Sequence, residues 1–189
     1  FITYAAYSFY SLFPQLAAFS LMVLFTIMTI AAALNYNRQV IAHIGLVGAY
    51  AVPFLLSENS GNVAVLYSYM AIINIGVLII SVKKYWKPLY YSSFILTWII
   101  FSFWYITDFQ ADTHSAIFWV FAFLFFMTFY LIFISYKLLH QEKFQASDVL
   151  LSLSNSFIFY GLGYSVLVND PGGDQLLGLF TLGNAAIHL

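Results

Sequence analysis

The sequence predicts an all-α protein, a polytopic integral membrane helical bundle of about eight transmembrane helices, of which the first and last are truncated. Hydrophobic residues make up 63% of the 189 residues and charged residues only 7%, whereas soluble domains carry about 25% charged residues. The apolar residues form long runs without the alternating polarity of membrane β-strands, which are about 10 residues long. Both observations indicate membrane-spanning helices.

Each predicted helix follows from an apolar run near the length of about 20 residues that a membrane crossing needs. In chain order the runs cover residues 1–13, 16–34, 40–56, 63–82, 89–106, 115–136, 149–168 and 175–189. Short segments rich in Pro, Gly, Asn, Ser or charged residues separate them, as is typical of turns. Because both terminal runs are cut short, we expect residues 1–189 to form a single transmembrane domain that is a fragment of a longer protein.

The basic residues predict the orientation of the helices, because they fall only in alternate loops. These loops hold Arg38, Lys83, Lys84, Lys87, Lys137 and Lys143. Short loops rich in Lys and Arg stay in the cytoplasm. We therefore expect these loops to be cytoplasmic, and segments 57–62, 108–114 and 170–174 to lie outside.

The third predicted helix holds three candidate residues for helix packing or a cavity: Gly45, Gly48 and Pro53. Small residues recur there at intervals of three or four, which lets another helix approach closely. The sequence of this stripe is Ala42, Gly45, Ala49 and Pro53. Pro53 kinks or ends a helix. It either lines a substrate path in a broken helix or is tolerated near a helix end, and we favour the second interpretation.

Two asparagines are further candidates. Asn74 is the twelfth residue of the fourth predicted helix, about 18 Å along it and so near mid-membrane. An unsatisfied polar group there costs several kcal/mol. Asn74 is therefore expected to hydrogen-bond a carbonyl of the third helix or a neighbouring hydroxyl, at the depth of Gly45 and Gly48. Asn155, in the serine-rich seventh helix, either makes such a structural bond or lines a cavity.

The sequence offers little for catalysis. No ionisable residue lies in the middle of a predicted helix, where pumps and proton-coupled carriers need one; His43 lies near a helix end and His188 cannot be placed. The chain has no cysteine, which excludes thiolate metal sites and disulfides. Its net charge of −1 does not provide the basic surface that binding to nucleic acid requires. We expect no catalytic residue, no metal and no cofactor.

One polar cluster allows an alternative. Asp108, Asp112 and His114 lie in one predicted outer loop, with Asp170 and Asp174 in another. Carboxylates and imidazole could hold a divalent cation or serve an outer-face hydrolase. The spacing matches no known site, and a solvated acidic loop is the favoured interpretation.

Part of the sequence resembles a known family. GAYAVPFLLSENSGN, then LYSYMAIINIGVLIISVKKYW, then Leu96 to Trp98, resembles the bacterial multi-span predicted membrane protein family (domain of unknown function 2339). The matching positions are Gly48, Pro53, Leu56, Ser57, Ser60, Gly61, Asn62, Tyr69, Asn74 and Lys83 to Trp86. Ala49 replaces a second glycine, and the resemblance covers residues 5–104. It implies a longer multi-pass protein of the bacterial cytoplasmic (inner) membrane, and it supplies no biochemical function or site residue.

Three functions remain open. The first is a structural or interaction module of the bacterial cell envelope, whose partners are the lipid bilayer and other membrane subunits. It is favoured because no charged relay or catalytic set is present. The alternative is a transporter or channel for a neutral or lipid-like substrate. The third is a membrane enzyme acting at the outer interface.

Overall fold

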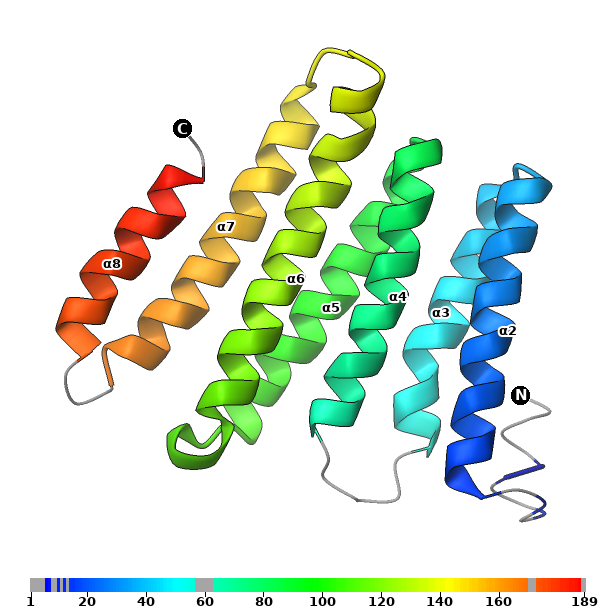
Figure 1. The fold of residues 1–189 in the computed structure, drawn as a ribbon, viewed down its shortest axis with the longest axis horizontal. Coiled ribbons are helices and arrows are strands. Elements are labelled where there is room, and N and C mark those ends of the chain that lie inside the picture. Colours follow the sequence, from blue (N-terminus) through cyan, green and yellow to red (C-terminus); the bar gives the residue numbers. More distant parts are fainter. Residues whose placement is uncertain are drawn as a thin grey trace. The chain divides into compact units, whose positions relative to one another are not determined.

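The computed structural model describes residues 6–7, 10, 12, 14–56, 63–169 and 173–187, and all regular structure in them is helical (Figure 1). The helices are α2 (Gln15–Asn35), α3 (Gln39–Leu56), α4 (Val63–Lys83), α5 (Lys87–Thr107), α6 (Ala111–Leu139), α7 (Ala146–Leu167) and α8 (Gly173–Ala186). Within these residues four helices, α4 to α7, are long and apolar enough to cross a membrane. The helical membrane class is therefore supported, but the predicted count of eight transmembrane helices is not confirmed.

The boundaries of α2 to α5 agree with the predicted runs to within two residues. Pro88 is the second residue of α5, a position where proline is tolerated because its missing N–H would have no partner within the helix. The predicted segments 1–13 and 57–62 lie outside the described residues or almost wholly so.

Helix α6 is longer at both ends than the predicted run of residues 115–136. It begins at Ala111, so Asp112 and His114 belong to its first turn rather than to a loop. The carbonyl of Gln110 accepts the N–H of His114, and Nδ1 of His114 lies 3.2 Å from the N–H of Gln110. These reciprocal bonds, with the acidic Asp112 at the positive end of the helix dipole, explain the early start.

The linker between α6 and α7 is correspondingly shorter than the predicted segment 137–148. Lys137 lies in the last turn of α6, and α7 begins at Ala146. Asp148 Oδ2 accepts the backbone N–H of Gln145 at 2.9 Å, which satisfies one of the unpaired donors at a helix start. Polar residues therefore extend both helices beyond the apolar run.

The chain groups into two compact units, Phe1–Leu96 and Thr97–Leu189, which divide within α5. In the first unit α3 and α4 both pack on α2. Gly45 lies against Thr29 of α2: a methyl group built at Gly45 would lie 2.5 Å from Cγ2 of Thr29. In the second unit α6 packs on α7 and α7 on α8. The expectation of a single domain stays a prediction.

Aromatic side chains fill the core of the second unit, while other apolar side chains face outward. Phe118, Phe125, Phe126 and Phe129 of α6 are fully buried.

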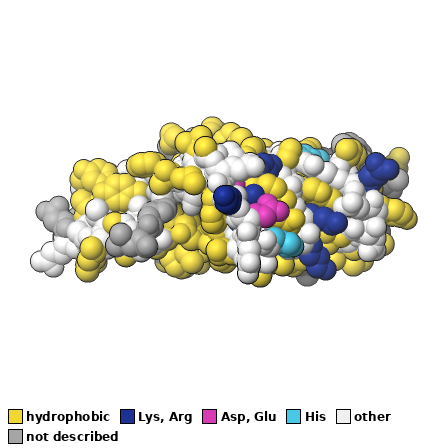
Figure 2. Space-filling view, turned by 90° about the horizontal axis from the view of Figure 1, so that it is seen from above, with side chains coloured by type: hydrophobic (Ala, Val, Ile, Leu, Met, Phe, Trp, Pro, Cys, Tyr) yellow, Lys and Arg dark blue, Asp and Glu magenta, His cyan; other side chains and the backbone are white. Residues whose placement is uncertain are grey.

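On α3 of the first unit, Val40, Ile44 and Val47 are each more than 60% exposed, and they repeat along one side of the helix. Such a stripe suits contact with lipid. Figure 2 looks onto helix ends, where Lys and Arg side chains stand among hydrophobic ones.

Candidate functional site

The side chain of Asn74 on α4 is fully buried and hydrogen-bonded across to α3. The hydroxyl of Tyr50 donates to Asn74 Oδ1 at 2.7 Å. The same hydroxyl lies 3.3 Å from the carbonyl oxygen of Ser93 on α5. The partner of Asn74 is thus a hydroxyl of α3, two residues beyond Gly48.

Asn155 on α7 is also fully buried and bonds to two other helices of the second unit. Its Oδ1 accepts the indole N–H of Trp98 on α5 at 3.0 Å. Its Nδ2 donates to the carbonyl oxygen of Phe126 on α6 at 2.9 Å. One amide therefore connects three helices, using both its acceptor and its donor.

The two amides share one arrangement. In each, the polar group of an aromatic side chain on another helix donates a hydrogen bond to the amide oxygen. Sequence reasoning singled out both asparagines but neither donor, Tyr50 or Trp98. A signal was available, because the polar tip of a buried Tyr or Trp usually finds a hydrogen-bond partner. Which aromatic residue serves which asparagine depends on how the helices pack, and the sequence does not show this.

The candidates on α3 differ in their surroundings. Gly45 is in close contact with α2, as the packing interpretation expects. Gly48 is exposed, and nothing lies within 4 Å of a methyl group built on it. Helix α3 continues through Pro53 to Leu56, so the proline does not end the helix at its own position. The side chain of Pro53 lies outside the described residues, and a path along it stays a prediction.

Two residues of the acidic cluster, Asp108 and His114, form local hydrogen bonds. Asp108 Oδ2 accepts from the hydroxyl of Thr107 at 2.6 Å, and His114 caps the start of α6. No three His, Asp or Glu side chains come together as metal ligands among the described residues. Asp170 and His188 lie outside them, as does the side chain of Asp174.

An ion pair between a buried lysine and an exposed glutamate joins the end of α6 to the following loop. Lys137 Nζ lies 2.9 Å from Glu142 Oε2, and the side chains are 3% and 46% exposed, respectively. The sequence places Lys137 in a predicted loop, which gave no reason to expect a buried ammonium. Its position follows from the extra turn of α6.

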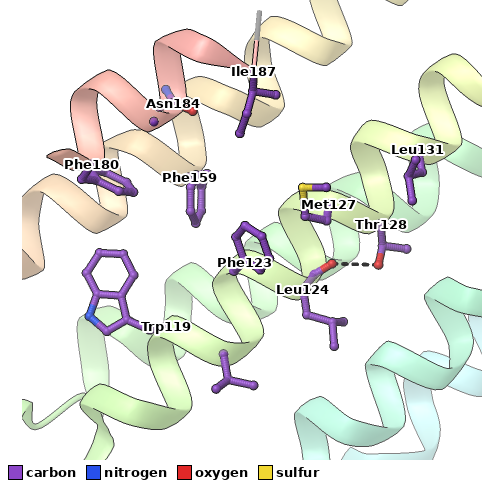
Figure 3. Close-up of a pocket in the computed structure, with 12 residues that line it drawn as sticks. Trp119, Phe123, Leu124, Met127, Thr128, Leu131, Phe159, Phe180, Asn184 and Ile187 are labelled. Atoms are coloured by element: carbon purple, nitrogen blue, oxygen red, sulfur yellow. Dashed lines mark hydrogen bonds between the residues drawn. The ribbon is translucent and has the colours of Figure 1, made fainter.

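A second feature that sequence reasoning missed is an apolar groove of about 860 Å³ among α6, α7 and α8 (Figure 3). The lining residues are Trp119, Val120, Phe123, Leu124, Met127, Thr128, Leu131, Phe159, Phe180, Gly183, Asn184 and Ile187. We refer to it as the α6–α8 groove. The four-residue spacing from Trp119 to Leu131 marks one face of a helix, but that spacing is the same whether the face meets another helix or an open groove.

Comparison with known proteins supplies the family. The family model described as "Predicted membrane protein (DUF2339)" matches residues 1–189. The match therefore extends past the resemblance over residues 5–104 and includes both units. No curated protein and no solved structure matches the chain. The chain belongs to the DUF2339 family of predicted membrane proteins.

Proposed function

We propose that this chain is a structural or interaction module of the bacterial cytoplasmic membrane, a helical scaffold without catalytic activity. The observation that carries the proposal is the use of the buried amides. Asn74 and Asn155 are both 0% exposed, and each is hydrogen-bonded to another helix. Polar groups near mid-membrane hold a substrate in many transporters, whereas these two hold helices together.

Thiol accessibility tests this proposal, since the chain has no cysteine of its own. Asn74→Cys and Asn155→Cys are each introduced alone into the full-length protein and treated with a membrane-impermeant, water-soluble thiol reagent. A scaffold leaves both cysteines unmodified in the folded protein and reactive after denaturation. Rapid modification of either in the folded protein would indicate a water-filled path and contradict the proposal.

The same chemistry tests the orientation. We infer that the loops carrying Arg38, Lys83, Lys84, Lys87, Lys137 and Lys143 face the cytoplasm, following the excess of Lys and Arg in cytoplasmic loops. Lys87→Cys is then labelled only after the cells are permeabilised, whereas Asp112→Cys is labelled in intact cells. Labelling of both from one side would overturn the orientation.

A carrier for a lipid-like substrate is the second candidate, and the α6–α8 groove is the observation that favours it. Vesicles containing the full-length protein and a fluorescent phospholipid separate the two functions. A carrier accelerates the exchange of the phospholipid between leaflets over protein-free vesicles. A scaffold leaves the exchange rate unchanged.

A further inference from the structure

We propose that the α6–α8 groove is a binding site for an acyl chain of a bilayer phospholipid. The site goes beyond the scaffold function and stands whether the chain is a scaffold or a carrier. The lining of the groove, the bridges at its two ends and its depth along α6 support this site.

The lining offers hydrocarbon and aromatic surface to an occupant. Trp119, Phe123, Met127 and Leu131 form one wall on α6, while Phe180 lies on α8 and Ile187 directly follows that helix (Figure 3). The hydroxyl of Thr128 is engaged with the carbonyl oxygen of Leu124 at 2.7 Å. Asn184 is the other polar side chain of the lining, and its buried Oδ1 meets no hydrogen-bond donor among the described residues. One buried amide oxygen does not replace the hydration shell of a headgroup or a charged ligand, so the matching ligand is an apolar chain.

Two contacts, which we call bridges, lie at the two ends of the groove. They join α6 to α8 and to Ile187 directly after it. At one end the rings of Trp119 and Phe180 meet edge to face, with centroids 5.5 Å apart. At the other, the hydroxyl of Tyr130 donates to the carbonyl oxygen of Ile187 at 3.0 Å. At 1.5 Å per residue the bridges are about 16 Å apart along α6 and about 10 Å along α8.

This length favours a lipid chain over a further transmembrane helix as the occupant of the space between the bridges. A crossing helix is about 30 Å long and 10–12 Å wide, so it would have to pass both bridges. A stretch of a flexible acyl chain fits between them. The groove volume of about 860 Å³ falls within the range of roughly 300–1,000 Å³ that small-molecule pockets occupy.

The depth of the groove places it where acyl chains are concentrated. The groove lines α6 from residue 119 to 131, and residue 125 is the midpoint of both that stretch and Ala111–Leu139. Val120 and Phe123 at its edge are 60% and 53% exposed, so the groove is open to the surrounding hydrocarbon. Since lipid tails gain little from leaving other lipid, packing between the bridges retains the chain.

A pair of glycines on α8 allows a matched test. Nothing lies within 4 Å of a methyl group built at Gly183 or at Gly178, but only Gly183 lines the groove. Gly183→Trp therefore fills the groove, whereas Gly178→Trp adds the same side chain elsewhere on the helix. Gly183→Ala adds one methyl group and leaves the groove open. Circular dichroism and size-exclusion chromatography confirm that each variant is folded.

The probe is phosphatidylcholine with a photoactivatable group on its acyl chain, in vesicles containing the full-length protein. Cross-linked peptides are quantified by mass spectrometry. We expect labelling of groove residues to exceed that of exposed residues elsewhere on α6 several-fold. We expect Gly183→Trp to lower it to that background, and Gly178→Trp and Gly183→Ala to keep it. Equal groove labelling in folded Gly183→Trp, or no excess in the unmodified protein, would overturn the proposal, as would groove cross-links to a second protein chain in its place.

Discussion

The hydroxyl of Tyr50 on α3 donates a hydrogen bond to the amide oxygen of Asn74 on α4, over 2.7 Å. Both side chains are buried, at 4% and 0% exposure, and hydrocarbon offers no competing partner. The bond therefore links α3 to α4 inside the core. Hydrogen bonds between membrane helices are worth about 0.6 kcal/mol on average, and up to about 1.7 kcal/mol.

Removing this donor gives the first prediction. Tyr50→Phe keeps the ring but leaves Asn74 Oδ1 without the Tyr50 hydroxyl, so we expect the free energy of unfolding to fall by about 1 kcal/mol. The measurement is reversible unfolding of the purified protein in mixed micelles with increasing denaturing detergent. Tyr36→Phe is the control, because Tyr36 is 73% exposed. Equal stability of the two variants would show that the bond contributes nothing.

The close contact between α2 and α3 gives the second prediction, with a matched control three residues away. A methyl group at Gly45 already meets the side chain of Thr29, whereas one at Gly48 meets nothing within 4 Å. Gly45→Leu should lower the free energy of unfolding by about 1–3 kcal/mol through overpacking, and Gly48→Leu should leave it nearly unchanged. The same unfolding measurement checks both. A larger loss for Gly48→Leu would mean that Gly48 is the packing residue.

The buried Lys137 gives the third prediction. Glu142→Gln removes the carboxylate of this ion pair, whereas Lys137→Met replaces the ammonium with an apolar side chain of similar length. We expect Glu142→Gln to be the more destabilising, by about 1 kcal/mol, because Glu142 is half exposed and solvent screens the pair. Lys143→Met, at an exposed position, is the control. If Lys137→Met proves more destabilising than Glu142→Gln, the ion pair does not stabilise the end of α6 and the loop that follows it.

The sequence predicts the helices wherever hydropathy alone sets their limits. Segments α2 to α5 begin and end close to the apolar runs. At α6 and α7 the limits depend instead on caps formed by polar residues, the pairs Gln110 with His114 and Gln145 with Asp148. Hydropathy alone assigns such residues to loops, so it predicts too late a start for both helices. The last turn of α6, which holds Lys137, also lies beyond the apolar run.

The sequence predicts that the candidate asparagines are hydrogen-bonded, but it does not predict which residues are their partners. A lone asparagine in an apolar helix must find a hydrogen bond, and this requirement predicts that Asn74 and Asn155 are bonded. The identities of Tyr50, Trp98 and Phe126 as partners require helix positions in space. The α6–α8 groove was hidden for a related reason, since its main walls come from α6 and α8, which are separated in the chain by the whole of α7.

The most direct test is a double-mutant cycle on Trp98 and Asn155, in which the free energy of unfolding of each variant is measured in mixed micelles. The central claim is that the buried amides hold helices together. Trp98→Phe, Asn155→Leu and the double variant then give a coupling free energy of about 0.6–1.7 kcal/mol in favour of the native pair. Additive losses, with a coupling energy of zero, would contradict the claim that the amide of Asn155 ties α7 to α5.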